Sequence, residues 1–183
     1  QGENAVLAKY GLSKGFILFV GNGLPHKNLG ILLESASHIK RQLVFIGVSK
    51  QNQVYWRFQY PEVNAVWLSY VKDEDLPVIL RNAFCLAHPS TAEGYGYPPL
   101  EAMACGVPAV ISDIPVLVET TGGGALAADP HATQAWVLAF EKLEDTAFSR
   151  AQVEKGLKWV QPFVGLRGWT RHVSDVKEVI EGS

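Results

Sequence analysis

The sequence predicts a doubly wound α/β domain, in which a parallel sheet of about six strands carries helices on both faces. Short apolar runs rich in branched residues alternate with longer segments of helical periodicity. The apolar runs are continuous rather than alternating, which is typical of strands buried on both faces of a parallel sheet. The chain has 183 residues, of which 48% are hydrophobic and 19% charged, as expected for one globular domain.

Each element follows from a local pattern. Strands are expected at residues 16–20, 43–46, 65–68, 84–87, 109–111 and 124–127. Helices are expected at residues 28–40, 51–59, 73–83, 98–105, 115–121, 131–143, 146–160 and 169–180. Asp73 is placed to cap the third helix, and the acidic residues that follow it suit the helix dipole. Pro98 and Pro99 suit the first turn of a helix, and Gly106 and Pro108 are expected to end that helix. Because such sheets bind ligands at the carboxyl ends of their strands, function is expected in the loops there.

Composition and charge exclude several classes of function. The net charge is −2, and the 16 Lys and Arg residues are scattered, so nucleic-acid binding is not expected. Apolar stretches such as residues 16–20 are far shorter than the roughly 20 residues that span a bilayer, so no transmembrane segment is expected. The five histidines and two cysteines do not fall at metal-ligand spacing, which predicts no metal site. Cys85 and Cys105 lie in apolar segments and are interpreted as reduced, buried thiols.

The loop GNGLPHKN at residues 21–28 follows the first strand and has features of a phosphate-binding turn. Gly21 and Gly23 allow a tight turn, and Lys27 precedes a helix N-terminus, where free N–H groups favour an anion. On this loop alone, a glycine-rich turn with a solvated lysine is the simpler explanation. The dinucleotide-binding pattern G-x-G-x-x-G is absent because His26 stands in place of the third glycine, which argues against a dehydrogenase.

The most informative stretch is HPSTAEGYGYPPLEAMACGVPAV, at residues 88–110. Glu93 is expected in a loop and Glu101 about one turn inside a helix, so the two carboxylates can face one cleft from different heights. Carboxylates accept hydrogen bonds from sugar hydroxyls, and Gly94 and Gly96 expose backbone amides between them. Since the helix N-terminus that follows can face a diphosphate, the stretch predicts a nucleotide-sugar pocket. The alternatives are an acid and base pair for glycoside hydrolysis, and a turn followed by a partly exposed helical glutamate.

These segments resemble the retaining glycosyltransferases of family 4, which have the two-domain GT-B architecture. The stretch EGYGYPPLEAMACGVP is similar to the E-x7-E signature of the family and the helix behind it. The stretch FVGNGLPHKNLGILLES resembles the first strand and phosphate-binding lysine loop, and VWLSYVKDEDLPVILRNA resembles the strand, loop and helix beside the nucleobase. The resemblance runs from about residue 16 to about residue 169.

The resemblance implies a role for each matching residue. Glu93 would accept hydrogen bonds from the transferred sugar, and Lys27 would neutralise charge on the leaving diphosphate; these two are the expected catalytic residues. Glu101 would hold the ribose hydroxyls. Further contacts to the donor sugar and phosphate are expected from Gly21, Asn22, Gly94, Tyr95, Gly96 and Tyr97, and contacts to the base from the backbone at Tyr70 and Val71.

The chain departs from the family pattern at two places. Many relatives have an arginine where this chain has Asn22, so Lys27 would be the single cation on the diphosphate, with help from His26. Pro98 and Pro99 have no N–H group to donate, so the phosphate would depend on neighbouring amides and on the helix dipole.

The resemblance also implies that residues 1–183 form one donor-binding domain, the C-terminal half of a two-domain enzyme. The missing N-terminal domain would bind the acceptor, a saccharide or a lipid-linked saccharide, and the isolated chain would be inactive or nearly so. The expected reaction is retaining transfer of a hexose, without a metal or cofactor. GDP-mannose is favoured over UDP-hexoses because the GNxxPHKN motif resembles that of mannosyltransferase-like members that act on surface polysaccharides. A cytoplasmic location is expected, peripheral to the inner membrane for the full-length protein.

Two other functions are weighed against this one. A nucleotide-sugar 2-epimerase has a similar architecture but is expected to carry different carboxylate and histidine motifs. A non-catalytic nucleotide- or carbohydrate-binding module would not need the intact lysine and glutamates. The aromatic residues Trp159, Phe163 and Trp169 are interpreted as packing residues rather than as a platform for a ligand.

Overall fold

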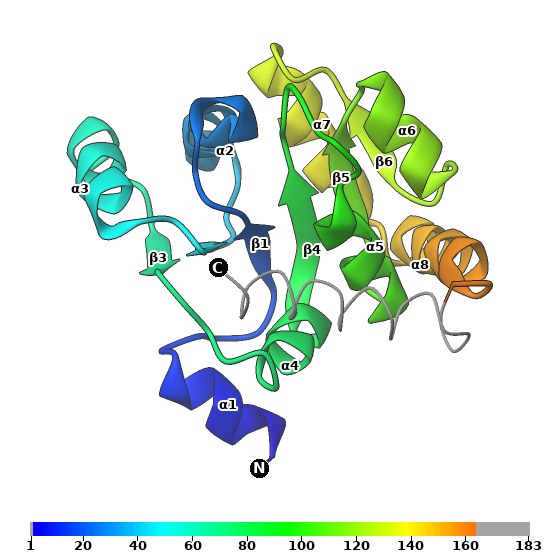
Figure 1. The fold of residues 1–183 in the computed structure, drawn as a ribbon, viewed down its shortest axis with the longest axis horizontal. Helices are drawn as coiled ribbons and strands as arrows, with labels where there is room; N and C mark the ends of the chain where they lie inside the picture. The colour runs from blue at the N-terminus through cyan, green and yellow to red at the C-terminus, as the bar shows by residue number, and fades with distance from the viewer. Residues whose placement is uncertain (1, 164–183) are drawn as a thin grey trace, which may run out of the picture.

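The computed structural model describes residues 2–163 and shows one sheet with six parallel strands (Figure 1). The strands are β1 (Phe16–Val20), β2 (Leu43–Ile46), β3 (Ala65–Leu68), β4 (Ala83–His88), β5 (Ala109–Ser112) and β6 (Leu126–Ala128). Their order is β3-β2-β1-β4-β5-β6. The first three strands extend the sheet to one side of β1, and β4 then begins the other side. The carboxyl ends of β1 and β4 therefore form the topological switch point, and the predicted doubly wound fold is confirmed.

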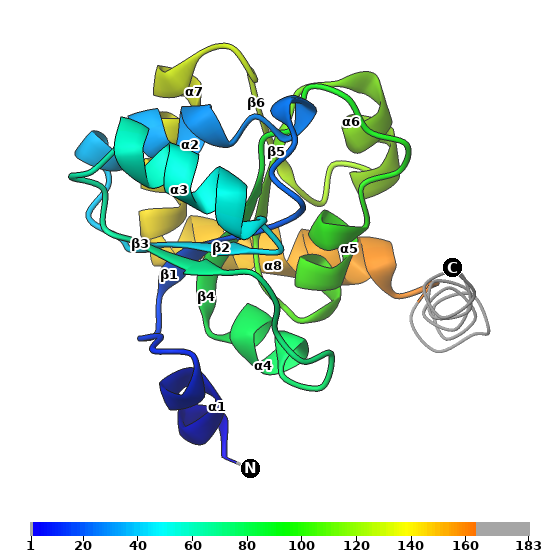
Figure 2. The ribbon, with the colours of Figure 1, turned by 60° about the vertical axis from the view of Figure 1, so that its left-hand side comes forward.

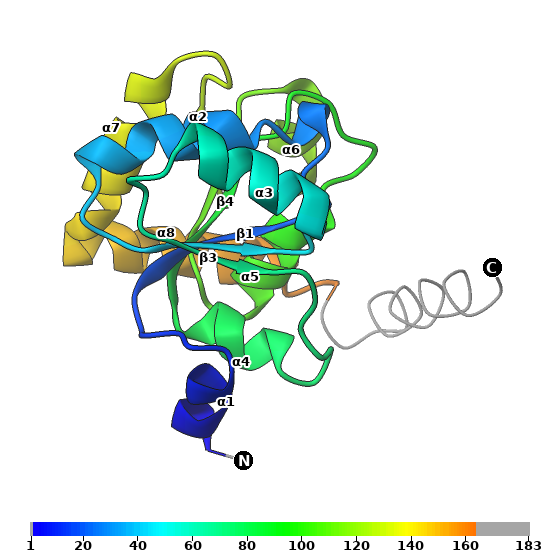
Figure 3. The same cartoon turned by 90° about the vertical axis from the view of Figure 1, so that its left-hand side faces the viewer.

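Helices cover both faces of the sheet (Figures 2 and 3). The α-helices are α1 (Glu3–Lys9), α2 (Leu29–Ser35), α3 (Lys50–Gln59), α4 (Leu76–Arg81), α5 (Tyr97–Ala104), α6 (Pro115–Thr121), α7 (Thr133–Glu144) and α8 (Thr146–Val160). Two 3-10 turns, η1 (Pro25–Lys27) and η2 (Ala36–His38), flank α2. Helices α2, α3 and α7 lie on one face, α1, α4 and α5 lie on the other, and α8 packs on α5 and α7.

The two-sided core explains why the strand sequences are continuously apolar. In β1, Ile17 and Phe19 belong to the core under α2 and α7, whereas Phe16 and Leu18 belong to the core under α1, α4 and α5. All four side chains are buried. Since successive strand residues point to opposite faces, a sheet covered on both sides has no position at which a polar residue is favoured.

Several element boundaries differ from the sequence-based expectation. The strand expected at residues 124–127 begins later, at Leu126, because the backbone of Gly122 and Gly123 is left-handed and the amide of Gly124 bonds to Thr121. The helix expected at residues 28–40 gives way to η2 after Ser35, whose hydroxyl donates to the backbone carbonyl of Ile31 at 2.7 Å. Such side-chain bonds compete with the regular helix ladder.

The predicted cap at Asp73 is wrong, because α4 begins only at Leu76 and is preceded by Asp75. The Asp75 carboxylate makes no capping bond; it accepts hydrogen bonds from Lys9 Nζ at 2.6 Å and Tyr10 Oη at 2.8 Å. These contacts attach α1, a helix that the sequence analysis did not predict, to α4. The helix expected at residues 169–180 lies outside the described residues.

Near the end of the described chain, Trp159 is 37% exposed, and its interpretation as a packing residue stays a prediction. Its indole Nε1 donates to the carbonyl of Thr120 at 2.8 Å, and its ring contacts Phe163 with centroids 6.4 Å apart. Trp169, assigned to the same class, lies outside the described residues. Within residues 2–163, no helix combines the length and the apolar character needed to span a membrane.

Candidate functional site

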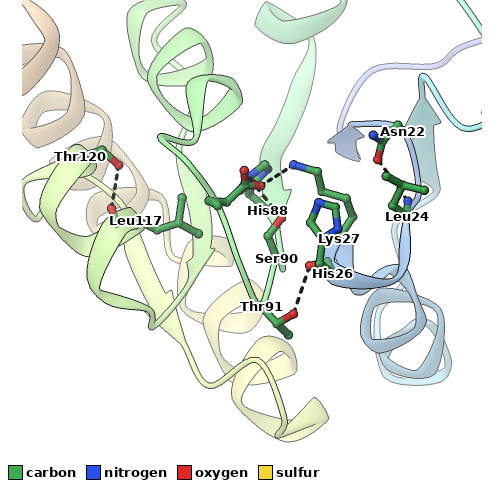
Figure 4. Close-up of polar contacts among 10 residues, drawn as sticks. Asn22, Leu24, His26, Lys27, His88, Ser90, Thr91, Leu117 and Thr120 are labelled. Carbon is green, nitrogen blue, oxygen red and sulfur yellow. Dashed lines mark hydrogen bonds and ion pairs between the residues drawn. The ribbon is translucent and has the colours of Figure 1, made fainter.

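The loops that follow β1 and β4 meet at the switch point of the sheet (Figure 4). The first loop contains η1, and the second contains residues 89–96. Thr91 connects them, because its backbone N–H and its hydroxyl both donate to the carbonyl of His26, at 2.8 and 3.3 Å. The two sequence motifs are therefore neighbours at the edge where doubly wound sheets bind ligands.

Lys27 and Glu93 form an ion pair across these two loops. The distance from Lys27 Nζ to Glu93 Oε1 is 2.6 Å, and the side chains are 16% and 10% exposed. Lys27 ends η1, and the next residue, Asn28, has a left-handed backbone (φ 52°) and donates from its side chain to the carbonyl of Pro130 at 2.8 Å. The sequence predicted that this cation and this carboxylate serve one site. Their direct pairing is an additional finding.

His88, which the sequence analysis did not single out, is a second partner of Glu93. It is the last residue of β4, its side chain is 1% exposed, and its Nε2 lies 2.7 Å from Glu93 Oε1. Burial opposes ionisation of Glu93, but hydrogen bonds from His88, Lys27 and Ser90 outweigh it and lower the pKa of Glu93 to about 2. Glu93 is therefore a carboxylate that only accepts hydrogen bonds at neutral pH. The available signal was the histidine that opens the two-glutamate stretch.

The turn between the two glutamates depends on glycine. Gly96 precedes α5 with φ 86°, and a Cβ atom there would lie 2.3 Å from Leu117 Cδ2. A Cβ atom on Gly94 would have no neighbour within 4 Å, so the backbone at that position is open to a ligand. The rings of Tyr95 and Tyr97 flank the turn, with centroids 4.7 Å apart.

Two residues expected at the phosphate have partners within the protein. The amide of Gly21 donates to the carbonyl of Ile46 at 2.9 Å, extending the sheet by one bond. The side chain of Asn22 accepts from the amide of Leu24 at 3.2 Å and shapes the turn before η1. Neither places a positive charge at the site, so Lys27 is the cation that this loop contributes.

Glu101 lies one turn into α5 and is half-buried. Burial raises the pKa of its carboxyl group. Within the described residues, no hydrogen bond or ion pair joins Glu101 to another side chain, including Lys27 and Glu93. The structure therefore shows two different carboxylates: Glu93 is paired and strongly acidic, and Glu101 is partly desolvated without a compensating partner.

The loop after β3 contains the two residues expected beside the base. Tyr70 is 70% exposed, whereas Val71 is buried in the core beneath α4. The tyrosine that follows α1 stabilises the loop, because the amide of Lys72 donates to Tyr10 Oη at 3.1 Å. The loop lies at the carboxyl edge of the sheet, as the parallel strands require.

The surface hollows described in the structure lie away from this site. Hollows of 510 and 550 Å³ lie near the turn before β2, are lined by Lys40 and Arg41 among others, and include neither Lys27 nor Glu93. Among residues 2–163, no group of three or more His, Cys, Asp or Glu is placed to hold a metal ion. Cys85 is a buried free thiol, as predicted, and Cys105 is a free thiol that is only half-buried.

Comparison with known proteins identifies the family. The pattern that defines the glycosyl transferases group 1 family matches residues 8–158, which include every site residue discussed above. The chain belongs to this family. This group 1 glycosyltransferase chain resembles O-antigen chain mannosyltransferase B of Escherichia coli, with 34% identity over 172 residues that cover 86% of the chain and 45% of the relative. It also resembles O-antigen chain mannosyltransferase RfbU of Salmonella typhimurium, with 30% identity over 137 residues that cover 72% of the chain and 39% of the relative.

A solved structure supports the same fold for this group 1 glycosyltransferase chain. Anabaena HepE, solved in complex with UDP-glucose, superposes with a TM-score of 0.75 and 20% identity, over 96% of this chain and 52% of that chain. The chain therefore matches 45%, 39% and 52% of the lengths of these three proteins. Family membership favours a glycosyltransferase over the epimerase alternative.

Proposed function

We propose that the chain binds a nucleotide-diphosphate sugar at the carboxyl ends of β1 and β4 and supplies it for transfer of a hexose with retention of configuration. The observation that carries this proposal is the meeting of Lys27 and Glu93 at the switch point of the sheet, 2.6 Å apart. One side chain suits a diphosphate and the other suits sugar hydroxyls, and these two groups are adjacent in a nucleotide sugar.

In this proposal, Lys27 stabilises the charge that develops on the diphosphate when the bond from the anomeric carbon to the phosphate oxygen breaks. Glu93 accepts hydrogen bonds from hydroxyls of the transferred sugar. Because its pKa is about 2, Glu93 is unsuited to act as a general acid at neutral pH, which argues against the glycoside-hydrolase alternative. The acceptor oxygen bonds to the anomeric carbon on the face that the phosphate leaves, and its proton passes to a phosphate oxygen.

Glu101 has the properties expected of a ribose ligand. A half-buried carboxylate without a hydrogen-bond donor is costly in the folded protein, and two vicinal hydroxyls can supply the missing donors. Open backbone at Gly94 and the tyrosines beside it would contact the sugar and the adjoining phosphate. The loop at Tyr70 and Val71 would present backbone groups to the base. No metal or cofactor is required in this scheme.

Mannose is the transferred sugar that we favour, with GDP-mannose as the donor. The two O-antigen relatives are named as mannosyltransferases, which supports this choice. HepE was solved with UDP-glucose, but at 20% identity it supports the fold and not the donor. The chain would act as the donor-binding half of a larger protein whose other half binds a saccharide or lipid-linked acceptor. The complete protein would work in the cytoplasm or at the inner face of the membrane.

Calorimetry on the purified chain tests the proposal. GDP is expected to bind more tightly than UDP, and tighter binding of UDP would overturn the choice of donor. Glu101→Ala is expected to weaken GDP binding about tenfold or more, because a hydrogen bond to a charged group contributes about 1.5–3 kcal/mol. Glu119→Ala, which removes an exposed glutamate from the neighbouring α6, is the matched control. Equal GDP affinity in the two variants would favour a binding module of another kind.

A further inference from the structure

His88 and Lys27 bind the same oxygen of Glu93, but the two side chains differ in mobility. His88 Nε2 lies 2.7 Å from Glu93 Oε1, and Lys27 Nζ lies 2.6 Å from it. The imidazole is anchored on a central strand and is 1% exposed, whereas the lysine is 16% exposed and has a flexible four-carbon stem. One partner of Glu93 is therefore fixed, and the other can move.

The arrangement around the imidazole defines which nitrogen donates. Because the ionised Glu93 can only accept, the tautomer that fits has its hydrogen on Nε2. The other nitrogen, Nδ1, is buried and has no hydrogen-bond partner among the described residues. Ser90 Oγ lies 3.4 Å from the same Nε2. The short bond to Glu93 is thus the main polar interaction of a fully buried ring, which suits a role in holding that carboxylate.

We propose that His88 is a positioning residue that keeps the Glu93 carboxylate in place when Lys27 moves from it to the diphosphate of the donor. This inference rests on the proposed function, in which Lys27 binds the diphosphate. A diphosphate carries more negative charge than one carboxylate, so it competes for the ammonium group. Without His88, the departure of Lys27 would leave Glu93 10% exposed and without a charged or ring N–H donor.

The groups that face Glu93 allow the two partners to be tested separately. Lys27 approaches Glu93 from η1, His88 from β4 and the Ser90 hydroxyl from the loop that follows β4, and each donates a hydrogen bond that favours the ionised carboxylate. Lys27→Met imitates the departure of the lysine without any ligand. His88→Met removes the imidazole donor, and His88→Gln offers an amide N–H in its place.

The experiment is a carboxyl-carbon NMR titration of Glu93 in the full chain, with the signal assigned from Glu93→Gln. Lys27→Met alone is expected to keep the pKa of Glu93 below its ordinary value of 4.5, because His88 still donates. Adding His88→Met is expected to raise the pKa further, since only Ser90 then opposes the effect of burial. Adding His88→Gln instead is expected to keep it low. If Lys27→Met alone titrates like the double variant, His88 does not hold the carboxylate and the proposal is overturned.

A binding measurement separates this proposal from the proposed function. His88→Met should weaken the binding of GDP, because the movement of Lys27 to the diphosphate would then leave Glu93 without either of its N–H donors. The loss should be smaller for GDP-mannose, whose sugar hydroxyls donate to Glu93, and His88→Gln should restore the affinity for GDP. If the wild-type chain binds neither ligand, the proposed function fails while the titration still decides whether His88 holds Glu93. If His88→Met binds GDP as tightly as the wild type does, the positioning role is refuted. His88→Phe replaces the methionine variant in both measurements if that variant does not fold.

Discussion

Replacing Glu93 with glutamine should change how the stability of the chain depends on pH. The carboxylate is 10% exposed, is paired with Lys27, and accepts a hydrogen bond from His88. These interactions favour the ionised form in the folded chain and are absent in the unfolded chain. Glu93→Gln keeps the shape of the side chain but removes its charge, so the effect isolates the electrostatic contribution.

The magnitude follows from the pKa of the carboxyl group. Folding lowers the pKa of Glu93 from its ordinary value of 4.5 to about 2. Since each pKa unit corresponds to about 1.4 kcal/mol, ionised Glu93 contributes about 3 kcal/mol to the free energy of unfolding. Because the folded pKa is the lower one, this contribution is fully present above pH 4.5 and is lost as the pH falls toward 2.

Urea unfolding followed by tryptophan fluorescence measures this effect, with parallel curves at several pH values between 7 and 3. Wild type should exceed Glu93→Gln by about 3 kcal/mol at pH 7, and the difference should shrink steadily below pH 4.5. Glu144→Gln is the control, because Glu144 is 55% exposed in its ion pair with Arg41 and such surface pairs contribute about 0–1 kcal/mol. A difference between wild type and Glu93→Gln that does not vary with pH would refute the reasoning.

Three further predictions follow from other residues. Gly96→Ala should lower the midpoint of thermal unfolding, at a cost of about 1–3 kcal/mol for the strained backbone and the side-chain clash, whereas Gly94→Ala should leave it nearly unchanged. Glu101→Gln should stabilise the chain at pH 7 but not at pH 4. Burial raises the pKa of Glu101, so its charged form is disfavoured in the folded state. Equal unfolding curves for wild type and variant at pH 7 would contradict this. In a thiol-labelling assay without denaturant, the half-buried Cys105 should react first and Cys85 only on unfolding, since full burial raises the pKa of Cys85 and excludes the reagent.

The strands were predictable because each one obeys a local rule. Residues 16–20, 43–46 and 65–68 match β1, β2 and β3 at both ends, since a strand covered on both faces must be apolar throughout. The start of α4 and the existence of α1 were not predictable, because both depend on a tertiary contact. The Asp75 carboxylate binds Lys9 and Tyr10 instead of capping its own helix, and residues so far apart in sequence give no local signal of such a contact.

The loops that form the site were predictable from the sequence. Parallel strands bring their carboxyl ends to one edge, so the lysine after β1 and the glutamate after β4 were expected to meet, and they do. The contact between His88 and Glu93 was not predictable from the sequence, for a physical reason. It ends a buried strand, where a histidine has no distinctive spacing, and only the fold of the following loop brings Glu93 back to within 2.7 Å of it.

The ion pair at the switch point also constrains how the site can work. Lys27 cannot bind a diphosphate at full strength while its ammonium group stays 2.6 Å from Glu93, so both proposed roles require the pair to open. Opening it in an empty site is costly because both side chains are mostly buried. The proposed donor would offer new partners to both side chains at once: its phosphate oxygens would bind the lysine, and its sugar hydroxyls would bind the glutamate. A nucleoside diphosphate without the sugar replaces only one partner, and Glu93 must then rely on His88. Under the proposed function, recognition of the sugar and of the diphosphate would therefore be coupled through a single carboxylate oxygen.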